Sequence, residues 1–129
     1  MPSAMTRLFG AEVVVLDGSM GAYLQSRGLP PGTPPDLWNI QRPDAVVQAH
    51  RLYAEAGAQV VLTNTFGATA PRLEMVGAAS DVAAINRAAV RNARDSGAPF
   101  VAGDVGPLGL VLEPAGELRF DAAVQLFAE

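Results

Sequence analysis

Residues 13–21 read VVVLDGSMG, an apolar run that passes directly into a turn containing two glycines. The run from Val13 to Leu16 contains no polar residue, which is typical of a strand buried on both faces of a parallel sheet. The turn begins at Asp17, and a helix is expected from Met20 to Arg27, where Gly28 ends it. The stretch therefore predicts a β-strand followed by an α-helix, the repeating unit of α/β folds.

Strands and helices continue to alternate along the rest of the chain. A helix is expected to begin at Pro43, where the missing N–H costs nothing, and to end at Gly57. A later helix is expected to be capped by Ser80 or Asp81, with an inner face formed by Val82, Ile85, Ala89 and Ala93. The predicted elements after residue 40 are helix 43–56, strand 59–63, a helical turn at 72–76, helix 82–96, strand 100–102 and helix 122–129, the last capped by Asp121.

This alternation predicts a parallel sheet with right-handed crossovers. A closed (β/α)8 barrel, which needs about 250 residues, and a doubly wound sheet both fit the pattern, which leaves the two open. The last predicted helix runs for about two turns without a C-cap, so we expect a piece of a larger fold that is cut short in its third helix. The third strand would then keep an unpaired edge, and self-association through that open edge is expected.

The composition is that of an ordinary globular chain: half of the residues are apolar, 17% are charged and the net charge is −4. The nine Lys and Arg residues are scattered, so no nucleic-acid partner is expected. Met1 to Thr6 lack the features of a signal peptide and no apolar run reaches about 18 residues, so we expect no membrane partner and a cytoplasmic location. The absence of cysteine excludes a thiolate metal site within these 129 residues.

A polar segment follows each predicted strand, where the reacting groups of parallel α/β folds lie. After the first strand, Asp17 to Gly21 either lets the backbone approach a carboxylate or phosphate, or forms a tight turn capped by Asp17. After the second strand, Thr63 and Thr65 should share one side and Asn64 the other; these side chains either contact a ligand or satisfy backbone groups. After the third strand, Asp104 is either an acid, base or ammonium partner, or a turn cap.

Two other residues invite a functional interpretation. His50, the only histidine, lies in the middle of a predicted helix and is expected to be a packing or surface residue, neither a base nor a ligand. Trp38, with Asp36 and Asn39 beside it, either walls a pocket from above or packs its loop onto the fold. The sequence alone leaves both roles open for Trp38.

The segments around these strand ends are similar, in order and spacing, to the homocysteine S-methyltransferase domain family of the cobalamin-dependent methionine synthase type. The resemblance extends from about Leu8 to Glu129. Any single match is weak, whereas their common order is specific. The matching motifs are Leu16-Asp17-Gly18-Ser19-Met20-Gly21, Leu37-Trp38-Asn39, Pro43-Asp44-Ala45-Val46, His50-x-x-Tyr53-x-x-Ala56-Gly57-Ala58, Thr63-Asn64-Thr65-Phe66-Gly67, Ile85-Asn86 and Ala102-Gly103-Asp104-Val105-Gly106-Pro107.

The resemblance implies the first three β/α units of a (β/α)8 TIM barrel, with residues 1–129 as a partial domain of about 40% of the barrel. It implies transfer of a methyl group to the thiol of homocysteine, which a zinc ion held by three cysteine thiolates activates by lowering the pKa of the thiol. The same family pattern places the substrate against Asp17, Gly18, Ser19 and Met20, with Thr63, Asn64 and Thr65 lining the pocket and Asp104 on its rim.

The chain departs from the family pattern because it has none of the zinc cysteines. We therefore expect an N-terminal part of a methionine-forming enzyme that is inactive as this chain alone. The methyl donor is undetermined: it could be methyltetrahydrofolate through cobalamin on other domains, S-methylmethionine or a betaine-like compound. The alternatives are a non-catalytic half-barrel for small-molecule binding or interaction, and a phosphate-binding barrel, which lacks an evident basic residue near Gly18 to Gly21.

Overall fold

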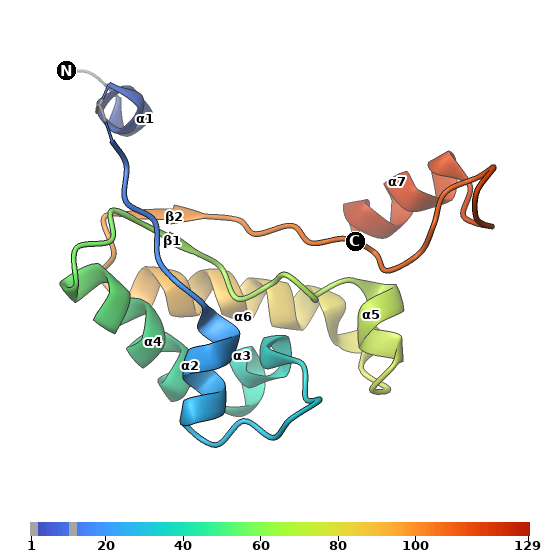
Figure 1. Cartoon of the computed structure of the whole chain (residues 1–129), viewed down its shortest axis with the longest axis horizontal. Helices are drawn as coiled ribbons and strands as arrows, with labels where there is room; N and C mark the ends of the chain where they lie inside the picture. Colours follow the sequence, from blue (N-terminus) through green and yellow to red (C-terminus); the bar gives the residue numbers. More distant parts are fainter. Residues whose placement is uncertain (1–2, 11–12) are drawn as a thin grey trace.

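The computed structural model describes residues 3–10 and 13–129 and has an α/β arrangement (Figure 1). Met1 and Pro2, part of the segment considered for a signal peptide, and residues 11–12 within the family resemblance lie outside the described residues. Among the described residues, no helix combines the length and apolar character needed to cross a bilayer. The elements are α1 (Ala4–Phe9), α2 (Met20–Ser26), η1 (Pro35–Leu37), α3 (Trp38–Gln41), α4 (Pro43–Glu55), β1 (Val60–Leu62), α5 (Ala70–Glu74), η2 (Ala79–Asp81), α6 (Val82–Asp95), β2 (Phe100–Ala102) and α7 (Phe120–Ala128).

The sheet is small, open and parallel. β1 pairs with β2 in the register Val60 to Phe100, and the segment before α2 lies along the other edge of β1. That segment joins β1 through the Gln59 N–H, which donates to the Val15 carbonyl at 2.8 Å, and the Asp17 N–H, which donates to the Val60 carbonyl at 3.0 Å. The three predicted strand regions therefore lie side by side in chain order, with their carboxyl ends at one edge of the sheet.

The prediction of a first strand buried on both faces is wrong. Residues 13–16 form a single bridge, between Leu16 and Val60, and the side chains of Val13, Val15 and Leu16 are 72%, 50% and 50% exposed. Burial on both faces needs a layer on each side of the sheet, whereas α4 and α6 lie together on one side of it (Figure 1). An apolar run shows that a strand can be buried on both faces, but the layers packed against the sheet determine whether it is buried.

The core lies beneath the sheet, between the helices and the segments that connect them. One cluster packs α2 against α3 and α4 through Leu24, Leu29, Trp38 and Val46. A second cluster joins α5 to the start of α6 through Leu73, Val82 and Ile85. All four residues predicted for the inner face of α6 are buried, which confirms the helical spacing. Trp38, 7% exposed within the first cluster, packs its segment onto the helices.

The helix boundaries follow the predictions most closely where a glycine or proline marks them. α2 and α4 begin at the predicted residues, and Gly28 and Gly57 adopt the positive φ angles of 100° and 109° that end helices. α5 begins at Ala70, two residues earlier than predicted, with Pro71 in its first turn. Asp81 takes the N-cap position of α6, although its side chain makes no capping hydrogen bond.

The predicted start of the last helix is wrong. α7 begins at Phe120 with Arg119 as its N-cap, so that Asp121 lies inside the first turn. The Asp121 carboxylate accepts two hydrogen bonds from the Arg119 guanidinium, each 3.0 Å long, and a neighbouring cation competes with the capping role. The hydrogen bonds to Arg119 lower the pKa of Asp121.

A buried amide network ties the connecting segments to the sheet. The Asn39 Nδ2 donates to the carbonyls of Asp36 at 2.8 Å and Asn64 at 2.7 Å. The Asn92 Nδ2, from α6, donates to the Asn39 carbonyl at 3.0 Å. The network holds η1 and α3 beside the carboxyl end of β1 and so fixes the wall of the site described next.

Candidate functional site

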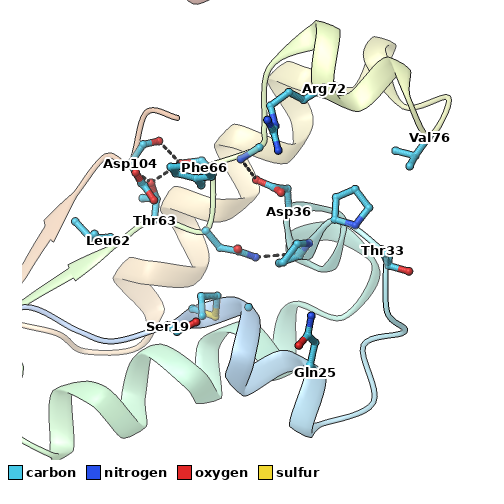
Figure 2. A pocket seen from close by; sticks show the side chains of 18 of the residues that line it. Ser19, Gln25, Thr33, Asp36, Leu62, Thr63, Phe66, Arg72, Val76 and Asp104 are labelled. Atoms are coloured by element: carbon cyan, nitrogen blue, oxygen red, sulfur yellow. Dashed lines mark hydrogen bonds between the residues drawn. The ribbon is translucent and has the colours of Figure 1, made fainter. Parts of the chain in front are cut away.

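A cavity of about 760 Å³ opens at the carboxyl ends of the strands (Figure 2). The structure brings all eight residues predicted for substrate contact to this one cavity, from three segments far apart in the sequence. Other walls come from the residues around η1 and α5. They include Asp36, which the sequence suggested only as a neighbour of Trp38, and Arg72, to which the sequence gave no role. The predicted residues that line the cavity are Asp17, Gly18, Ser19, Met20, Thr63, Asn64, Thr65 and Asp104.

The Asp17 side chain adds a hydrogen bond to the backbone pairing between the segment before α2 and β1. Its Oδ2 accepts a hydrogen bond from the Leu62 N–H at 3.1 Å, and the side chain is 3% exposed. Burial raises the pKa of Asp17, the Leu62 N–H acts in the opposite direction, and the nearby charge of Asp104 adds to the rise. The other oxygen, Oδ1, is buried without a hydrogen-bond partner among the described residues. The carboxylate is thus held at one oxygen and unsatisfied at the other.

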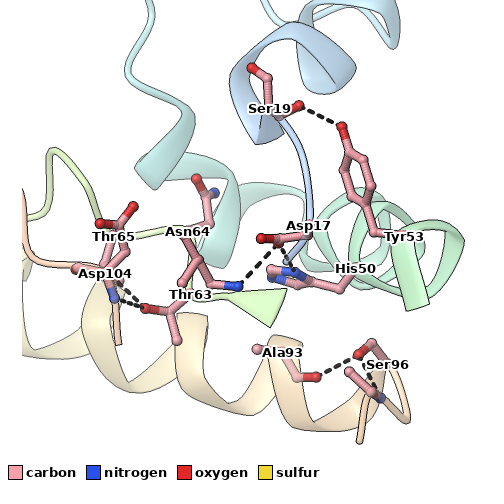
Figure 3. Close-up of polar contacts among 12 residues, drawn as sticks. Asp17, Ser19, His50, Tyr53, Thr63, Asn64, Thr65, Ala93, Ser96 and Asp104 are labelled. Carbon is pink, nitrogen blue, oxygen red and sulfur yellow. Dashed lines mark hydrogen bonds and ion pairs between the residues drawn. The ribbon is translucent and has the colours of Figure 1, made fainter. Parts of the chain in front are cut away.

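His50 lies directly behind Asp17 (Figure 3). Its side chain is fully buried, and its Nδ1 is 4.0 Å from the Asp17 Oδ2, too long for a hydrogen bond. Neither ring nitrogen has a partner among the described residues, and burial lowers the pKa of His50 to about 4. Of the two roles expected for His50, packing or surface, the structure thus shows the packing role, but its position behind Asp17 was missed. The available signal was the spacing of four residues from the buried Val46.

Tyr53, one turn further along α4, holds the loop that follows Asp17. Its hydroxyl donates to the Ser19 carbonyl at 3.0 Å, while the Ser19 Oγ accepts from the Ala22 N–H at 3.2 Å and caps α2. A Cβ atom at Gly18 would stand 2.9 Å from the Tyr53 Cε1. The glycine therefore permits close approach, as the sequence suggested, but the approaching group is the Tyr53 ring.

We predict that Gly18→Ala lowers the free energy of unfolding by about 1–3 kcal/mol, because the new methyl group must displace the Tyr53 ring from Ser19. Gly21→Ala in the same segment is the matched control, since its nearest contact would be an ordinary 3.6 Å to the Pro35 Cγ. Urea unfolding of both variants measures the difference. Equal stability of the two variants would show that Tyr53 does not restrict Gly18.

Thr63, Thr65 and Asp104 join the ends of β1 and β2. The Thr65 hydroxyl donates to the Asp104 carbonyl at 2.7 Å, and the Asp104 N–H donates to the Thr63 Oγ1 at 3.0 Å. The two threonine oxygens are 2.7 Å apart, and because the Thr65 proton is already used, Thr63 is the donor between them. Both hydroxyl protons are thus taken, and each oxygen can only accept a hydrogen bond from a ligand.

The remaining strand-end residues make structural contacts. Asn64 points to the side opposite the threonines, as predicted, and its Nδ2 donates to the Pro35 carbonyl at 2.9 Å. In the third loop, a Cβ atom at Gly106 would overlap the Phe66 carbonyl, so glycine is needed where this loop crosses the second one. These contacts support the interpretation that part of each motif satisfies backbone groups.

Asp36 and Arg72 face each other on the wall formed by η1 and α5 (Figure 2). Asp36 is 4% exposed, and its Oδ1 accepts from the Gly67 N–H at 2.9 Å. Burial raises the pKa of Asp36, which the Gly67 N–H and the positive charge of Arg72 partly oppose. Folding also brings Arg72 to the cavity that Gly18 and Gly21 line, although Arg72 lies about 50 residues later in the sequence.

Comparison with known proteins identifies the family. A family model described as homocysteine S-methyltransferase matches residues 14–129. The chain belongs to the homocysteine S-methyltransferase family. The resemblance stated from the sequence motifs is thereby confirmed.

The relatives of this homocysteine S-methyltransferase family member are longer proteins. S-methylmethionine–homocysteine S-methyltransferase BHMT2 of Rattus norvegicus is 36% identical over 78% of this chain and 28% of its own length. The homocysteine S-methyltransferase of Escherichia coli is 30% identical over 85% of this chain and 40% of its own length. The methionine synthase of Mycobacterium tuberculosis is 32% identical over 92% of this chain and 11% of its own length. The chain spans less than half the length of each relative.

The fold is also similar to a solved structure of the family. The oxidized form of the homocysteine methyltransferase MmuM from Escherichia coli superposes with a TM-score of 0.68 at 28% identity. The match covers 84% of this chain and 42% of the MmuM chain. The α/β arrangement with a small open sheet is consistent with part of a barrel.

The residues of this homocysteine S-methyltransferase domain do not fit a zinc site of the family type. The chain contains no cysteine. Within residues 3–10 and 13–129, no group of three or more His, Cys, Asp or Glu side chains could hold a metal ion. We therefore assign no metal-dependent step to these residues.

Proposed function

We propose that this chain forms part of the homocysteine-binding wall of a methyltransferase that moves a methyl group onto the homocysteine thiol and forms methionine. One observation carries the proposal: all eight residues that the family pattern assigns to the substrate line a single cavity. Family membership over residues 14–129 supports the same activity. The free acceptor sites on Thr63 and Thr65 and the carboxylate of Asp17 suit the ammonium group of an amino acid.

We infer that residues 1–129 correspond to the first three units of a (β/α)8 barrel. The parallel strand regions lie in chain order, and α4 and α6 cover one side of the sheet (Figure 1). The match to 42% of the MmuM chain agrees with a partial barrel of about this size. An unpaired sheet edge favours association with another chain, so we also propose self-association through the open edge of the partial barrel.

We further propose that the zinc-binding thiolates of the working enzyme lie outside these 129 residues. An ordinary thiol has a pKa of about 8.5 and is mostly protonated at neutral pH, and nothing among the described residues supplies a metal or a thiolate to change that. Where methyltetrahydrofolate is the methyl donor, it and cobalamin would act through other domains. The same observation favours the second candidate, a half-barrel that binds a small molecule without catalysis.

We predict that the purified 129-residue protein makes no methionine from homocysteine and S-methylmethionine. The chain has no cysteine, and residues 3–10 and 13–129 hold no metal-binding group that could ionise the thiol. Methionine formation is measured by chromatography, with the Escherichia coli homocysteine S-methyltransferase as the positive control. Methionine above the level without protein would overturn the prediction.

A binding measurement tests whether the chain binds homocysteine. Homocysteine should raise the midpoint of thermal unfolding, since a ligand at ten times its Kd stabilises the folded state by about 1.4 kcal/mol. Asp17→Asn should remove most of this shift, whereas Asp44→Asn, at an exposed position of α4, should leave it intact. The absence of any shift in the unmodified protein would overturn the proposed homocysteine-binding wall.

A further inference from the structure

Arg72 is the only cationic side chain on a cavity wall that also carries Asp17, Asp36 and Asp104, counting the residues that the structure describes. The position of Arg72 follows from its neighbours in the fold. Leu73 is fully buried in the cluster beneath α5, and the Asn86 Nδ2 from α6 donates to the Ala68 carbonyl at 2.9 Å. These two contacts fix the short α5 helix and therefore the direction of Arg72.

The Arg72 guanidinium lies over backbone that carries no side chains. A Cβ atom at Gly67 would stand 3.6 Å from the Arg72 Nε, and one at Gly109 would stand 3.5 Å from its Nη1. Gly109 also has a φ angle of 79°, which favours glycine. The third loop and the loop after β1 thus both lie beside the planar group, which Figure 2 shows pointing from α5 toward Asp36.

The guanidinium keeps its hydrogen-bonding capacity. Among the described residues it makes no ion pair within 4.0 Å and no hydrogen bond, although Asp36 is near enough for their charges to interact. Asp36 already receives the Gly67 N–H. A half-buried guanidinium presents a rigid fork of donors that matches a carboxylate, so its free N–H groups are available to a ligand in the cavity.

The charges of the cavity restrict which anion fits. Three carboxylates and one guanidinium line it, and a dianion such as phosphate would be repelled by the acidic majority. A ligand that carries a cation close to its carboxylate avoids this repulsion. Thr63 and Thr65 can only accept hydrogen bonds, which also favours a ligand with N–H donors.

We propose that Arg72 binds the carboxylate of a zwitterionic amino-acid ligand in this cavity, with the cationic part of the ligand facing the acidic side chains. The inference deepens the proposed function, on which it rests, by assigning the carboxylate end of the ligand to a residue outside the strand-end motifs. It requires Arg72 to discriminate between ligands with and without a carboxylate.

Three probes of similar shape test this role on the 129-residue protein at pH 7. L-Methionine carries both charged groups, 3-(methylthio)propylamine lacks the carboxylate, and 4-(methylthio)butanoic acid lacks the ammonium. Titration calorimetry should show methionine binding roughly ten- to hundredfold more tightly than the amine, the range expected for charge-assisted hydrogen bonds. Inorganic phosphate should not displace methionine.

Arg72→Gln should reduce the advantage of methionine over the amine to less than about threefold while keeping its advantage over the acid. Arg51→Gln, at an exposed position on α4 away from the cavity, is the matched control and should keep both advantages. Unfolding curves of the variants show whether each is folded.

Each other outcome decides against the inference. If Arg72→Gln keeps the preference for methionine over the amine, or weakens all three probes equally, Arg72 does not bind the carboxylate, and a shift with homocysteine still supports the proposed function. Displacement of methionine by phosphate would favour a phosphate site instead. If neither homocysteine nor methionine binds, both proposals fail together.

Discussion

Replacing Asn39 with alanine is expected to lower the free energy of unfolding by about 3 kcal/mol or more. The side chain is 1% exposed and its Nδ2 donates to two carbonyl groups, of Asp36 and of Asn64, which the substitution leaves without this donor. A buried group without a partner costs about 1–3 kcal/mol. The Asp36 carbonyl keeps the Trp38 N–H, so this cost falls on the Asn64 carbonyl and adds to the lost hydrogen bonds and the cavity created. Urea unfolding monitored by circular dichroism measures the change.

Two further variants separate the hydrogen bonds from the volume. Asn39→Asp keeps the size but removes the amide donor, and it should be destabilised to a similar extent. Gln41→Ala, at the exposed end of the same α3 helix, should change stability by less than about 0.5 kcal/mol. If Asn39→Asp is as stable as the unmodified protein, the donated hydrogen bonds do not hold η1 against β1.

The unmodified protein is expected to lose stability as the pH falls from about 6.5 toward 4, because of His50. Burial lowers the pKa of this residue in the folded state to about 4, while the unfolded chain takes up the proton near its ordinary value of 6.5. Between these values the unfolded state binds more protons, so acid favours unfolding. Each pH unit costs about 1.4 kcal/mol, which amounts to about 3 kcal/mol over the whole window.

His50→Leu isolates this effect, because His50 is the only histidine and neither of its ring nitrogens has a hydrogen-bond partner among the described residues. The variant should match the unmodified protein at pH 7 and exceed its stability by about 2 kcal/mol at pH 5. The raised pKa values of Asp17 and Asp36 act in the opposite direction, since the folded state then takes up protons more readily, and both proteins share them. Parallel stability curves between pH 7 and 5 would contradict a buried neutral His50.

Predictions based on short-range signals were reliable for this chain. Pro43, Gly28 and Gly57 mark real helix boundaries because their φ preferences are properties of the residues themselves. The start of the last helix was predicted wrongly. The prediction used the general preference of Asp for N-cap positions, whereas in the structure the Asp121 carboxylate is bound by the Arg119 guanidinium.

The candidate site was predictable where its residues follow strands. Parallel strands place their carboxyl ends at one edge, so Asp17, Thr63 and Asp104 meet whatever the helices do. Arg72 was missed because it lies on α5 and not directly after a strand. The direction of its side chain depends on the burial of Leu73 and on the hydrogen bond of Asn86. The position of His50 behind Asp17 likewise requires α4 to pack against β1.

The sequence by itself determined the order of strands and helices, the family and the three polar strand ends, because periodicity, glycine and proline positions and motif order act locally along the chain. Only the tertiary structure decided the exposure of residues 13–16, the core position of Trp38, and the meeting of Arg72 with Asp36 on the cavity wall. Burial and charge are properties of neighbours in space, and those neighbours come from segments that the chain brings together only on folding.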